Sequence, residues 1–294
     1  MTIVLTGATG FLRGHLLNAL VAAGHRVLAY VRPGSTSARP AGAEWFPLEM
    51  GHEDVAFRAA KVDAIIHTAT CYGRARESVP ELLEVNLVLP VLLARQAVRF
   101  EVPTLINTDT YFNRDDRGSA LLPDYTLSKN HALHWLQRCT KETSLRLANL
   151  RIEHMYGPRD RPEKFCPSVL GAMCRHQPEL WLTSGEQKRD FIYVDDVVAA
   201  FLTVLEKWGA RAGEHVQFNV GTGQSIPIRD FICIGHQLAH SRTKLMFGAL
   251  PSRPEDFTDS CADNKILREL GWSPEVDLRT GIERTLKSLA VPHS

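Results

Sequence analysis

The 294-residue sequence lacks the features that mark membrane-spanning, exported and nucleic-acid-binding proteins. No stretch approaches the roughly 20 consecutive apolar residues that a membrane-spanning helix needs, so we expect no membrane partner. No long run of Lys and Arg occurs and the formal net charge is +1, so we expect no nucleic-acid partner. The chain opens on a strand-like run, without the basic and apolar regions of a signal peptide.

Metal-binding patterns are also missing. The six cysteines and 12 histidines are scattered without zinc-like spacing, so we expect no metal site. Scattered cysteines fit a reducing compartment, and we therefore expect a cytoplasmic protein. With 44% hydrophobic residues the chain can form a substantial core, and its length fits one large or two small domains.

The first feature that is present is a glycine turn near the N-terminus. Residues 2–6 (TIVLT) form a short β-branched run, Gly7 and Gly10 follow, and a helical pattern runs over 11–23. This order is typical of a dinucleotide-binding turn, in which the bare glycine backbone approaches a pyrophosphate at the helix N-terminus. Arg13 stands where a third glycine is usual, which puts a cation beside the phosphates. An ordinary strand–helix turn is the alternative interpretation.

The second feature is the pair Tyr125 and Lys129. The lysine follows the tyrosine by four residues, so on a helix both side chains project from one face. A tyrosine has an unperturbed pKa of ~10, and a nearby ammonium stabilises its phenolate. We expect Lys129 to lower the pKa of Tyr125, which would let the phenol exchange a proton with a sugar or alcohol oxygen. Taken alone, the pair could equally be an ordinary surface Tyr and Lys.

Strand and helix patterns alternate through the first half of the chain. Strands are predicted near 2–6, 26–31, 63–68, 103–107 and 145–151, and helices near 11–23, 80–99 and 125–143. Such alternation predicts an α/β fold with a doubly wound parallel sheet (Rossmann) and ligands at the carboxyl ends of the strands. Beyond Arg151 the pattern becomes irregular and richer in proline, which indicates a smaller substrate-binding lobe, mostly C-terminal.

Several further segments occur in a fixed order. They are residues 63–69 (DAIIHTA), 84–88 (EVNLV), 105–110 (LINTDT), 156–159 (YGPR), 189–196 (RDFIYVDD) and 253–256 (RPED). With these segments the chain resembles the extended short-chain dehydrogenase/reductases that act on nucleotide sugars, over nearly its whole length. The resemblance implies a discontinuous NADP(H)-binding Rossmann domain, 1–153 with 189–220. It also implies a nucleotide-sugar-binding lobe, 154–188 with 221–294.

The resemblance also implies roles for individual residues. The catalytic set would be Thr108, Tyr125 and Lys129. Cofactor-binding residues would be Gly7, Thr9, Gly10, Phe11, Leu12, Arg13, Arg32, Glu49, Thr68, Ala69, Thr70, Asn86, Tyr125, Lys129 and Ile152. Substrate-binding residues would be Cys71, Tyr72, Asp109, Thr110, His154, Arg189, Arg253 and Asp256. Among these, Arg189 and Arg253 are candidates for the pyrophosphate, and structural ion pairs are the alternative.

The end of the second predicted strand bears on the choice of cofactor. An acidic residue there would hold the ribose hydroxyls of NAD, but this chain has Val31 followed by Arg32. Without the carboxylate a 2′-phosphate is not repelled, and Arg32 offers a planar guanidinium to pair with it. NADP(H) is therefore favoured over NAD(H), with an exposed loop arginine as the alternative interpretation.

The family that the chain resembles includes epimerases, dehydratases and ketoreductases. Its dehydratases carry an Asp-Glu pair after the catalytic threonine, whereas this chain has Asp109 and then Thr110, so we do not expect elimination of water. Residues 107–113 and 124–129 are similar to the abequose/paratose synthase group, which reduces the 4-keto group of CDP-4-keto-6-deoxyhexoses. Tyr111 and Phe112 replace the usual Tyr-Gly of the wider family.

We therefore predict NADPH-dependent reduction of a nucleotide-linked 4-keto-6-deoxyhexose, in deoxysugar and surface-polysaccharide (O-antigen) biosynthesis. Tyr125 would donate the proton, Thr108 would bind the same oxygen, and Lys129 would also bind the nicotinamide ribose. A nucleotide-sugar 4-epimerase that retains NAD and a non-catalytic NADP(H)-binding regulatory protein stay open as alternatives.

Two predicted long helices, 80–100 and 125–143, bear on assembly. Both have apolar residues over more than one stripe, and related enzymes pair these two helices with their copies across a twofold axis. A homodimer is therefore expected. The apolar residues in question are Leu82, Leu83, Leu89, Leu92, Leu93, Leu133, Trp135 and Leu136.

Overall fold

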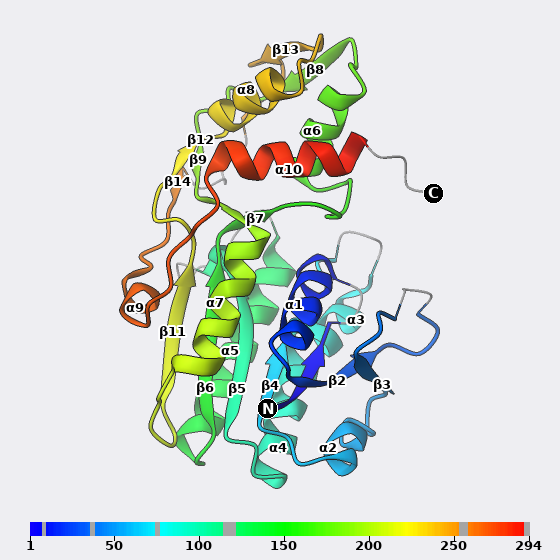
Figure 1. The fold of residues 1–294 in the computed structure, drawn as a ribbon, viewed down its shortest axis with the longest axis vertical. Coiled ribbons are helices and arrows are strands. Elements are labelled where there is room, and N and C mark those ends of the chain that lie inside the picture. The colour runs from blue at the N-terminus through cyan, green and yellow to red at the C-terminus, as the bar shows by residue number, and fades with distance from the viewer. Residues whose placement is uncertain (8–9, 36–38, 74–76, 114–121, 253–257, 291–294) are drawn as a thin grey trace. The chain divides into compact units, whose positions relative to one another are not determined.

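The computed structural model of the protein describes residues 1–7, 10–35, 39–73, 77–113, 122–252 and 258–290, and only the backbone of Arg13. The chain divides into two compact units (Figure 1). Unit 1 comprises Met1–Arg151 and Val198–Phe218, and unit 2 comprises Ile152–Val197 and Asn219–Ser294. It remains a proposal that unit 1 binds the cofactor and that unit 2 binds the nucleotide sugar.

Unit 1 is built on a parallel sheet. Among the described residues it has seven strands in the order β11-β6-β5-β4-β1-β2-β3. The strands are β1 Thr2–Thr6, β2 Arg26–Val31, β3 Ala43–Pro47, β4 Ala64–His67, β5 Thr104–Thr110, β6 Arg146–Ile152 and β11 His215–Val220. The recorded registers of β1 with β2 and β4, of β2 with β3 and of β4 with β5 are all parallel. The predicted α/β fold with a doubly wound parallel sheet is confirmed.

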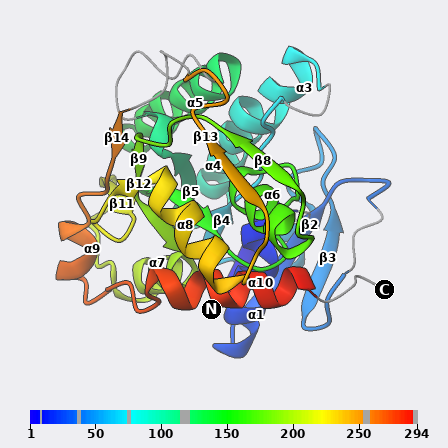
Figure 2. The ribbon, with the colours of Figure 1, turned by 90° about the horizontal axis from the view of Figure 1, so that it is seen from above.

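Helices cover both faces of this sheet (Figure 2). They are α1 Phe11–Ala22, α2 Val55–Ala59, α3 Val79–Leu83, α4 Leu89–Arg99, α5 Pro123–Lys141 and α7 Val194–Lys207, of which Val198–Lys207 belongs to unit 1. Buried residues of the strands, such as Ile65 and Leu105, pack with Leu93 of α4 and Leu136 of α5 in one hydrophobic cluster. The helices α1 and α7 lie on the opposite face (Figure 1).

The predicted helix over 80–100 contains an irregularity that the sequence did not indicate. The chain is helical from Val79 to Arg99, but a π-helical turn, η1 (Glu84–Val88), separates α3 from α4. Most of the apolar residues that we assigned to a dimer surface are instead buried within the unit, because they cover the sheet. The buried ones are Leu82, Leu89, Leu93, Leu133 and Leu136.

Two strands of the sheet, β3 and β11, were absent from the sequence prediction. Both lie at the edges of the sheet and are only partly buried. An edge strand has one strand neighbour and keeps polar residues, so it lacks the continuous β-branched run that made β1 and β2 easy to predict.

Unit 2 has short strands and four helices of its own among the described residues. The strands are β7 His154–Tyr156, β8 Glu179–Leu182, β9 Lys188–Arg189, β10 Phe191–Tyr193, β12 Ile226–Pro227, β13 Lys244–Phe247 and β14 Asp259–Ser260. The helices are α6 Phe165–Cys174, α8 Ile228–Leu238, α9 Lys265–Glu269 and α10 Leu278–Ala290. Its core is aromatic, with the rings of Phe191 and Phe231 stacked at 4.3 Å and Tyr156 edge-on to both.

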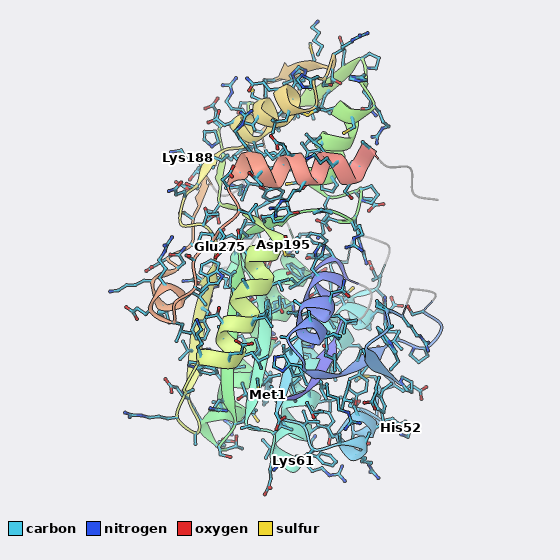
Figure 3. The ribbon with its side chains drawn as sticks, viewed as in Figure 1. Met1, His52, Lys61, Lys188, Asp195 and Glu275 are labelled. Atoms are coloured by element: carbon cyan, nitrogen blue, oxygen red, sulfur yellow. The ribbon has the colours of Figure 1, made fainter. Side chains whose placement is uncertain are left out.

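Buried carboxylates hold the loops of unit 2. Asp190 is fully buried and accepts hydrogen bonds from the backbone N–H groups of Thr222 (2.8 Å) and Ala262 (3.1 Å). Asp196, in the first turn of α7, accepts the backbone N–H of Glu275 at 2.9 Å. Figure 3 labels Glu275 and Asp195, the residue before Asp196. Because each carboxylate satisfies backbone donors from distant segments, it fixes loops that have little regular structure of their own.

Neither a candidate membrane span nor a candidate metal-binding cluster occurs among the described residues. No helix in them has the length and apolar character to cross a membrane. No group of three or more His, Cys, Asp or Glu side chains in the same ranges is arranged to hold a metal ion.

Candidate active site

Gly7, directly after β1, lies against the backbone that follows β4. Gly7 has a φ of +89°, and a Cβ there would lie 2.6 Å from the backbone N of Ala69, so only glycine fits. Gly10 donates its N–H to the Gly7 carbonyl (3.0 Å) and caps α1 without a side-chain hydrogen bond. The first turn of α1 has no acidic residue. The N-terminus of α1, with no side-chain cap and no acidic residue, therefore suits an anion.

Not all residues predicted for this turn can contribute a side chain. Leu12 is buried, so that its side chain belongs to the core. Phe11 is half-buried and begins the helix. Thr9 and the side chain of Arg13 lie outside the described residues.

The ends of β1 and β4 are tied together beside the turn. His67 is fully buried, and its Nδ1 lies 2.8 Å from the Thr6 hydroxyl. Thr68 donates its hydroxyl to the Thr6 carbonyl at 2.7 Å. Burial lowers the pKa of His67 well below its ordinary value, and the charge of Lys129 acts in the same direction. His67 is therefore neutral and lies beside the end of β1 in the interior of unit 1.

Helix α5 brings the predicted catalytic pair into the interior of unit 1. Tyr125 and Lys129 are 5% and 3% exposed, one turn apart, as the spacing predicted. Lys129 donates its Nζ hydrogen to the backbone carbonyl of Thr108 at 3.1 Å. Burial lowers the pKa of Lys129 to about 8, and the nearby carboxylate of Asp109 opposes this shift. At neutral pH the ammonium form still predominates.

The pKa of Tyr125 departs from the sequence prediction. We expected Lys129 to lower it, but burial raises the pKa of Tyr125 well above its ordinary value. Desolvation disfavours the phenolate, and it outweighs the stabilisation that a neighbouring charge can supply here. Tyr72, whose ring lies 4.9 Å from that of Tyr125, also raises this pKa, whereas the Thr110 side chain lowers it.

Two threonines of β5 lie next to this pair. Thr108 is half-buried, and its hydroxyl oxygen is enclosed without a hydrogen-bond partner. Thr110 is 7% exposed, and its hydroxyl accepts the backbone N–H of Phe112 at 3.3 Å. The Thr110 hydroxyl therefore has a hydrogen-bond partner within the protein, and the Thr108 hydroxyl has none.

Asp109, predicted to bind substrate, has other partners in the structure. Its carboxylate is buried and accepts hydrogen bonds from Asn113 (2.8 Å) and Asn149 (3.0 Å), with Arg151 Nε at 3.7 Å. Asn107 in turn donates to Asn149 at 2.7 Å. This network joins β5, β6 and the 3-10 turn η2 (Tyr111–Asn113). The sequence prediction missed the asparagines, although the alternation of 107 with 109 could have indicated a shared strand face.

Asn86, predicted to bind the cofactor, lies fully buried in the π turn. Its Nδ2 donates to the Cys71 carbonyl (2.7 Å) and to Ser128 Oγ (3.1 Å), and its Oδ1 accepts the Cys71 N–H (2.9 Å). Ser128 Oγ donates to the Tyr125 carbonyl at 2.7 Å. Both amide hydrogens of Asn86 are thus used within the protein, and the side chain links the segment after β4 to α5.

The other predicted site residues have varied surroundings. In unit 1, Arg32 and Glu49 are exposed, Thr70 and Cys71 are half-buried and Ala69 is buried. Ile152 is buried at the end of β6. In unit 2, His154 is half-buried on β7, and Arg189 is 3% exposed and donates to the Lys188 carbonyl at 2.7 Å. Arg253 and Asp256 lie outside the described residues.

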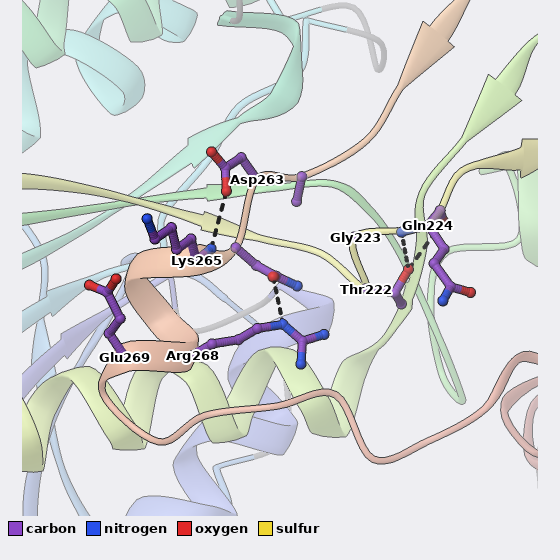
Figure 4. Close-up of a pocket in the computed structure, with 9 residues that line it drawn as sticks. Thr222, Gly223, Gln224, Asp263, Lys265, Arg268 and Glu269 are labelled. Atoms are coloured by element: carbon purple, nitrogen blue, oxygen red, sulfur yellow. Dashed lines mark hydrogen bonds between the residues drawn. The ribbon is translucent and has the colours of Figure 1, made fainter.

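A surface pocket of about 560 Å³ lies within unit 2 (Figure 4). It is lined by Thr222 and Gln224 on one side and by Lys265, Arg268 and Glu269 of α9 on the other. The guanidinium of Arg268 donates to the Asn264 side chain at 2.8 Å. None of the predicted site residues lines this pocket, and we do not assign it to the reaction.

The sequence was also compared with known proteins. A model of the NAD dependent epimerase/dehydratase family matches residues 3–221. The chain belongs to this family. The CDP-abequose synthase of Salmonella typhimurium is 32% identical over 294 residues, which cover 98% of each chain. The dTDP-4-dehydro-6-deoxyglucose reductase of Escherichia coli is 33% identical over 189 residues, 62% of this chain and 57% of the relative.

Solved structures of UDP-sugar 4-epimerases share the fold. The UDP-glucuronic acid 4-epimerase of Bacillus cereus, in complex with UDP-glucuronic acid and NAD, superposes with a TM-score of 0.83. It is 22% identical, and the match covers 98% of this chain and 99% of that one. At this identity the likeness establishes the fold alone.

Proposed function

We propose that the protein is an NADPH-dependent reductase of the 4-keto group of a nucleoside-diphospho-4-keto-6-deoxyhexose, with CDP as the proposed nucleotide. Its place would be in deoxysugar and surface-polysaccharide biosynthesis. The observation that carries the proposal is the similarity to CDP-abequose synthase over 98% of both chains, in a protein that buries Tyr125 and Lys129 together. The shorter match to a dTDP-4-dehydro-6-deoxyglucose reductase supports the same chemistry.

The cofactor site would be formed by unit 1. Gly7, Gly10 and the N-terminus of α1 would hold the pyrophosphate, because the first turn of α1 has neither a side-chain cap nor an acidic residue. Arg32 is exposed just beyond β2, where it is available to pair with a 2′-phosphate. A bound nicotinamide supplies the hydride that reaches C4 of the sugar.

The protein side of the reaction is proton transfer. Because burial raises the pKa of Tyr125, its phenol keeps its proton at neutral pH and can act as the general acid for the alkoxide at C4. The ammonium of Lys129, buried one turn away, would stabilise the phenolate that remains. A threonine hydroxyl of β5 would add a hydrogen bond at the same place.

The site gives less support to elimination of water. The Asp109 carboxylate already accepts from Asn113 and Asn149, and Thr110 stands where the dehydratases have their second acid. A 4-epimerase that retains NAD uses the same tyrosine and lysine, so it is the alternative that an experiment must separate.

The test is turnover with NADPH and a panel of CDP-, dTDP-, GDP- and UDP-linked 4-keto-6-deoxyhexoses. We expect stoichiometric loss of NADPH absorbance with a CDP-linked substrate, and a product reduced at C4 by NMR. The control is Tyr125→Phe, which should bind NADPH with unchanged affinity and turn over ~10²–10⁴-fold more slowly. Interconversion of CDP-sugars without added cofactor, by protein that carries NAD, would favour the epimerase. Tight NADPH binding without turnover of any sugar would favour the non-catalytic protein.

A further inference from the structure

A second tyrosine, Tyr72, packs on the ring of Tyr125. The two ring centroids lie 4.9 Å apart and the ring planes are tilted by 35°, so the two rings are in direct contact. Tyr125 is 5% exposed, whereas Tyr72 is half-buried. Tyr72 is therefore the more exposed of the two rings, and it lies over one side of the buried one.

The backbone on either side of Tyr72 is held in place. Asn86 binds the preceding residue, Cys71, at both its N–H (2.9 Å) and its carbonyl (2.7 Å). The following residue, Gly73, has a φ of +66°, and a Cβ there would lie 3.0 Å from Cδ1 of Leu82. Because both neighbours are held, the Tyr72 side chain leaves the backbone in a set direction.

Ser128 connects this segment with the helix that carries Tyr125. It is 1% exposed, accepts an amide hydrogen of Asn86 at 3.1 Å and donates its own hydrogen to the Tyr125 carbonyl at 2.7 Å. The contacts thus run from Tyr125 through Ser128 and Asn86 to the backbone of Cys71. They return through the ring of the next residue, Tyr72, to the ring of Tyr125. This closed set of contacts restricts movement of the Tyr72 ring away from the phenol.

We infer that Tyr72 is a positioning residue that covers the phenol of Tyr125 and keeps water from it, an inference that rests on the proposed role of Tyr125 as general acid. Ser128 and Asn86 hold the Tyr72 ring in place. A covered phenol meets few water molecules that could exchange its proton in place of the sugar oxygen. The ring contact also fixes the orientation of the phenol before the sugar binds. Tyr72 itself exchanges no proton in the reaction.

The first test measures ionisation of Tyr125 and does not depend on turnover. Tyrosine labelled with ¹³C at Cζ reports phenol ionisation by NMR, and Tyr125→Phe identifies the signal. Tyr72→Ala should admit water to the phenol and lower the pKa of Tyr125 by about one pH unit or more, because burial is the largest cause of its elevation. Tyr72→Phe keeps the ring and should leave this pKa close to that of the parent protein.

The other titratable groups near the phenol are the same in both variants. Asp109 of β5 and Tyr111 of η2 act on Tyr125, and Lys129 lies one turn along α5. Tyr72 also raises the pKa of Tyr125 electrostatically, and the comparison of Ala with Phe separates this effect from that of the ring. An equal fall of the pKa in Tyr72→Phe and Tyr72→Ala, or no fall in Tyr72→Ala, would overturn the inference.

The second test asks whether Ser128 acts through Tyr72. Ser128→Ala removes the acceptor of one Asn86 amide hydrogen, so it should lower the pKa of Tyr125 by less than Tyr72→Ala does. When Tyr72 is already alanine, Ser128→Ala should cause no further fall, because the ring that Ser128 helps to hold is gone. An additive effect in the double variant, or no effect of Ser128→Ala alone, would overturn the role of Ser128.

Turnover separates this inference from the proposed reaction. We expect kcat of Tyr72→Ala to lie about 10- to 100-fold below that of Tyr72→Phe, with a similar KM for NADPH, because the phenol is neither covered nor oriented. If no sugar of the panel is reduced but Tyr72→Ala still lowers the pKa of Tyr125, the proposed reaction is wrong and the covering role of Tyr72 stands. If the pKa is unchanged, the covering role is wrong whatever the substrate.

Discussion

Lys129 illustrates at the scale of one residue how a functional group can be held at a cost to stability. It is 3% exposed, and burial lowers its pKa from 10.5 to about 8. The folded protein therefore binds this proton less tightly than the unfolded chain does. The destabilisation is fully present below pH 8 and is lost as the pH rises toward 10.5.

Lys129→Met should make the folded protein more stable and inactive. Removing the buried ammonium should stabilise the folded state by about 3 kcal/mol at neutral pH, as the pKa shift implies. Losing the hydrogen bond to Thr108 should destabilise it by about 1 kcal/mol. We therefore expect urea unfolding at pH ~7 to show a gain of about 2 kcal/mol that vanishes near pH ~10. Lys141→Met, at the exposed end of the same helix, is the control and should show no such pH dependence. A gain of equal size at both pH values would contradict this explanation.

Arg32 makes the choice of cofactor testable. Arg32→Ala should weaken NADPH binding by roughly 1–3 kcal/mol, because a charge-assisted contact with the 2′-phosphate is lost, and should leave NADH binding nearly unchanged. Arg58→Ala removes an exposed arginine that pairs with Asp54 and is the control for net charge. Fluorescence titration with both cofactors measures the effect. Equal losses for NADPH and NADH would mean that Arg32 does not read the phosphate.

At the scale of elements, the network around Asp109 joins the ends of β5 and β6. Asn149 donates to Asp109 Oδ2 and accepts from Asn107, so its amide is oriented by both partners. The charge of Asp109 also acts on Lys129. A substitution can therefore affect the site through the hydrogen-bond pattern or through the charge.

An exchange of the two side chains separates these effects. Asp109→Asn alone would direct its amide N–H₂ group at that of Asn149. It should lower kcat, and it should lower the free energy of unfolding by about 1–3 kcal/mol. The double variant Asp109→Asn with Asn149→Asp restores a donor–acceptor pair. The amide then stands at position 109 and the carboxylate at position 149. We expect it to recover most of the stability, as measured by thermal unfolding. If the double variant is as unstable as the single one, the position of the charge governs the network, and the hydrogen-bond pattern does not.

The elements themselves differed in how far the sequence could predict them. β1, β2 and α5 follow from β-branched runs and from helical spacing, because their patterns arise from burial against one layer. The pairing of Tyr125 with Lys129 followed from the same periodicity. The hydrogen bonds around Asp109 could not be predicted, since they depend on how β6 and η2 lie beside the end of β5. The raised pKa of Tyr125 was also out of reach, because burial is a property of the whole unit.

At the scale of the whole molecule, exposed apolar side chains remain on two helical segments. Leu127 and Trp135, two turns apart on α5, are 56% and 55% exposed. Val79, Val88 and Val98, along the α3–η1–α4 segment, are 50%, 37% and 40% exposed. Of the apolar residues that the sequence suggested, Trp135 is part of this surface, and the others of the surface lie on the same two helical segments. A homodimer through it remains a prediction.

Leu127→Glu with Trp135→Glu should therefore shift the protein from dimer to monomer, because buried charges would oppose association. Trp181→Glu, which changes a 59% exposed tryptophan on β8 of unit 2, is the matched control and should leave the mass unchanged. Light scattering at micromolar concentration measures both. A monomer mass for the unchanged protein would contradict the prediction.

The π turn at Glu84–Val88 sets the rotational phase between α3 and α4. A residue more or less in a helix rotates everything on one side of it by about 100° relative to the other side. Asn86 lies in this turn, where its side chain forms hydrogen bonds with Cys71 and Ser128. Loss of a single residue from this turn would yield a more regular helix and would turn Asn86 away from both. The number of residues in this segment therefore matters to the candidate active site as much as the identity of Asn86 does. Substitutions in the segment should be tolerated far better than deletions.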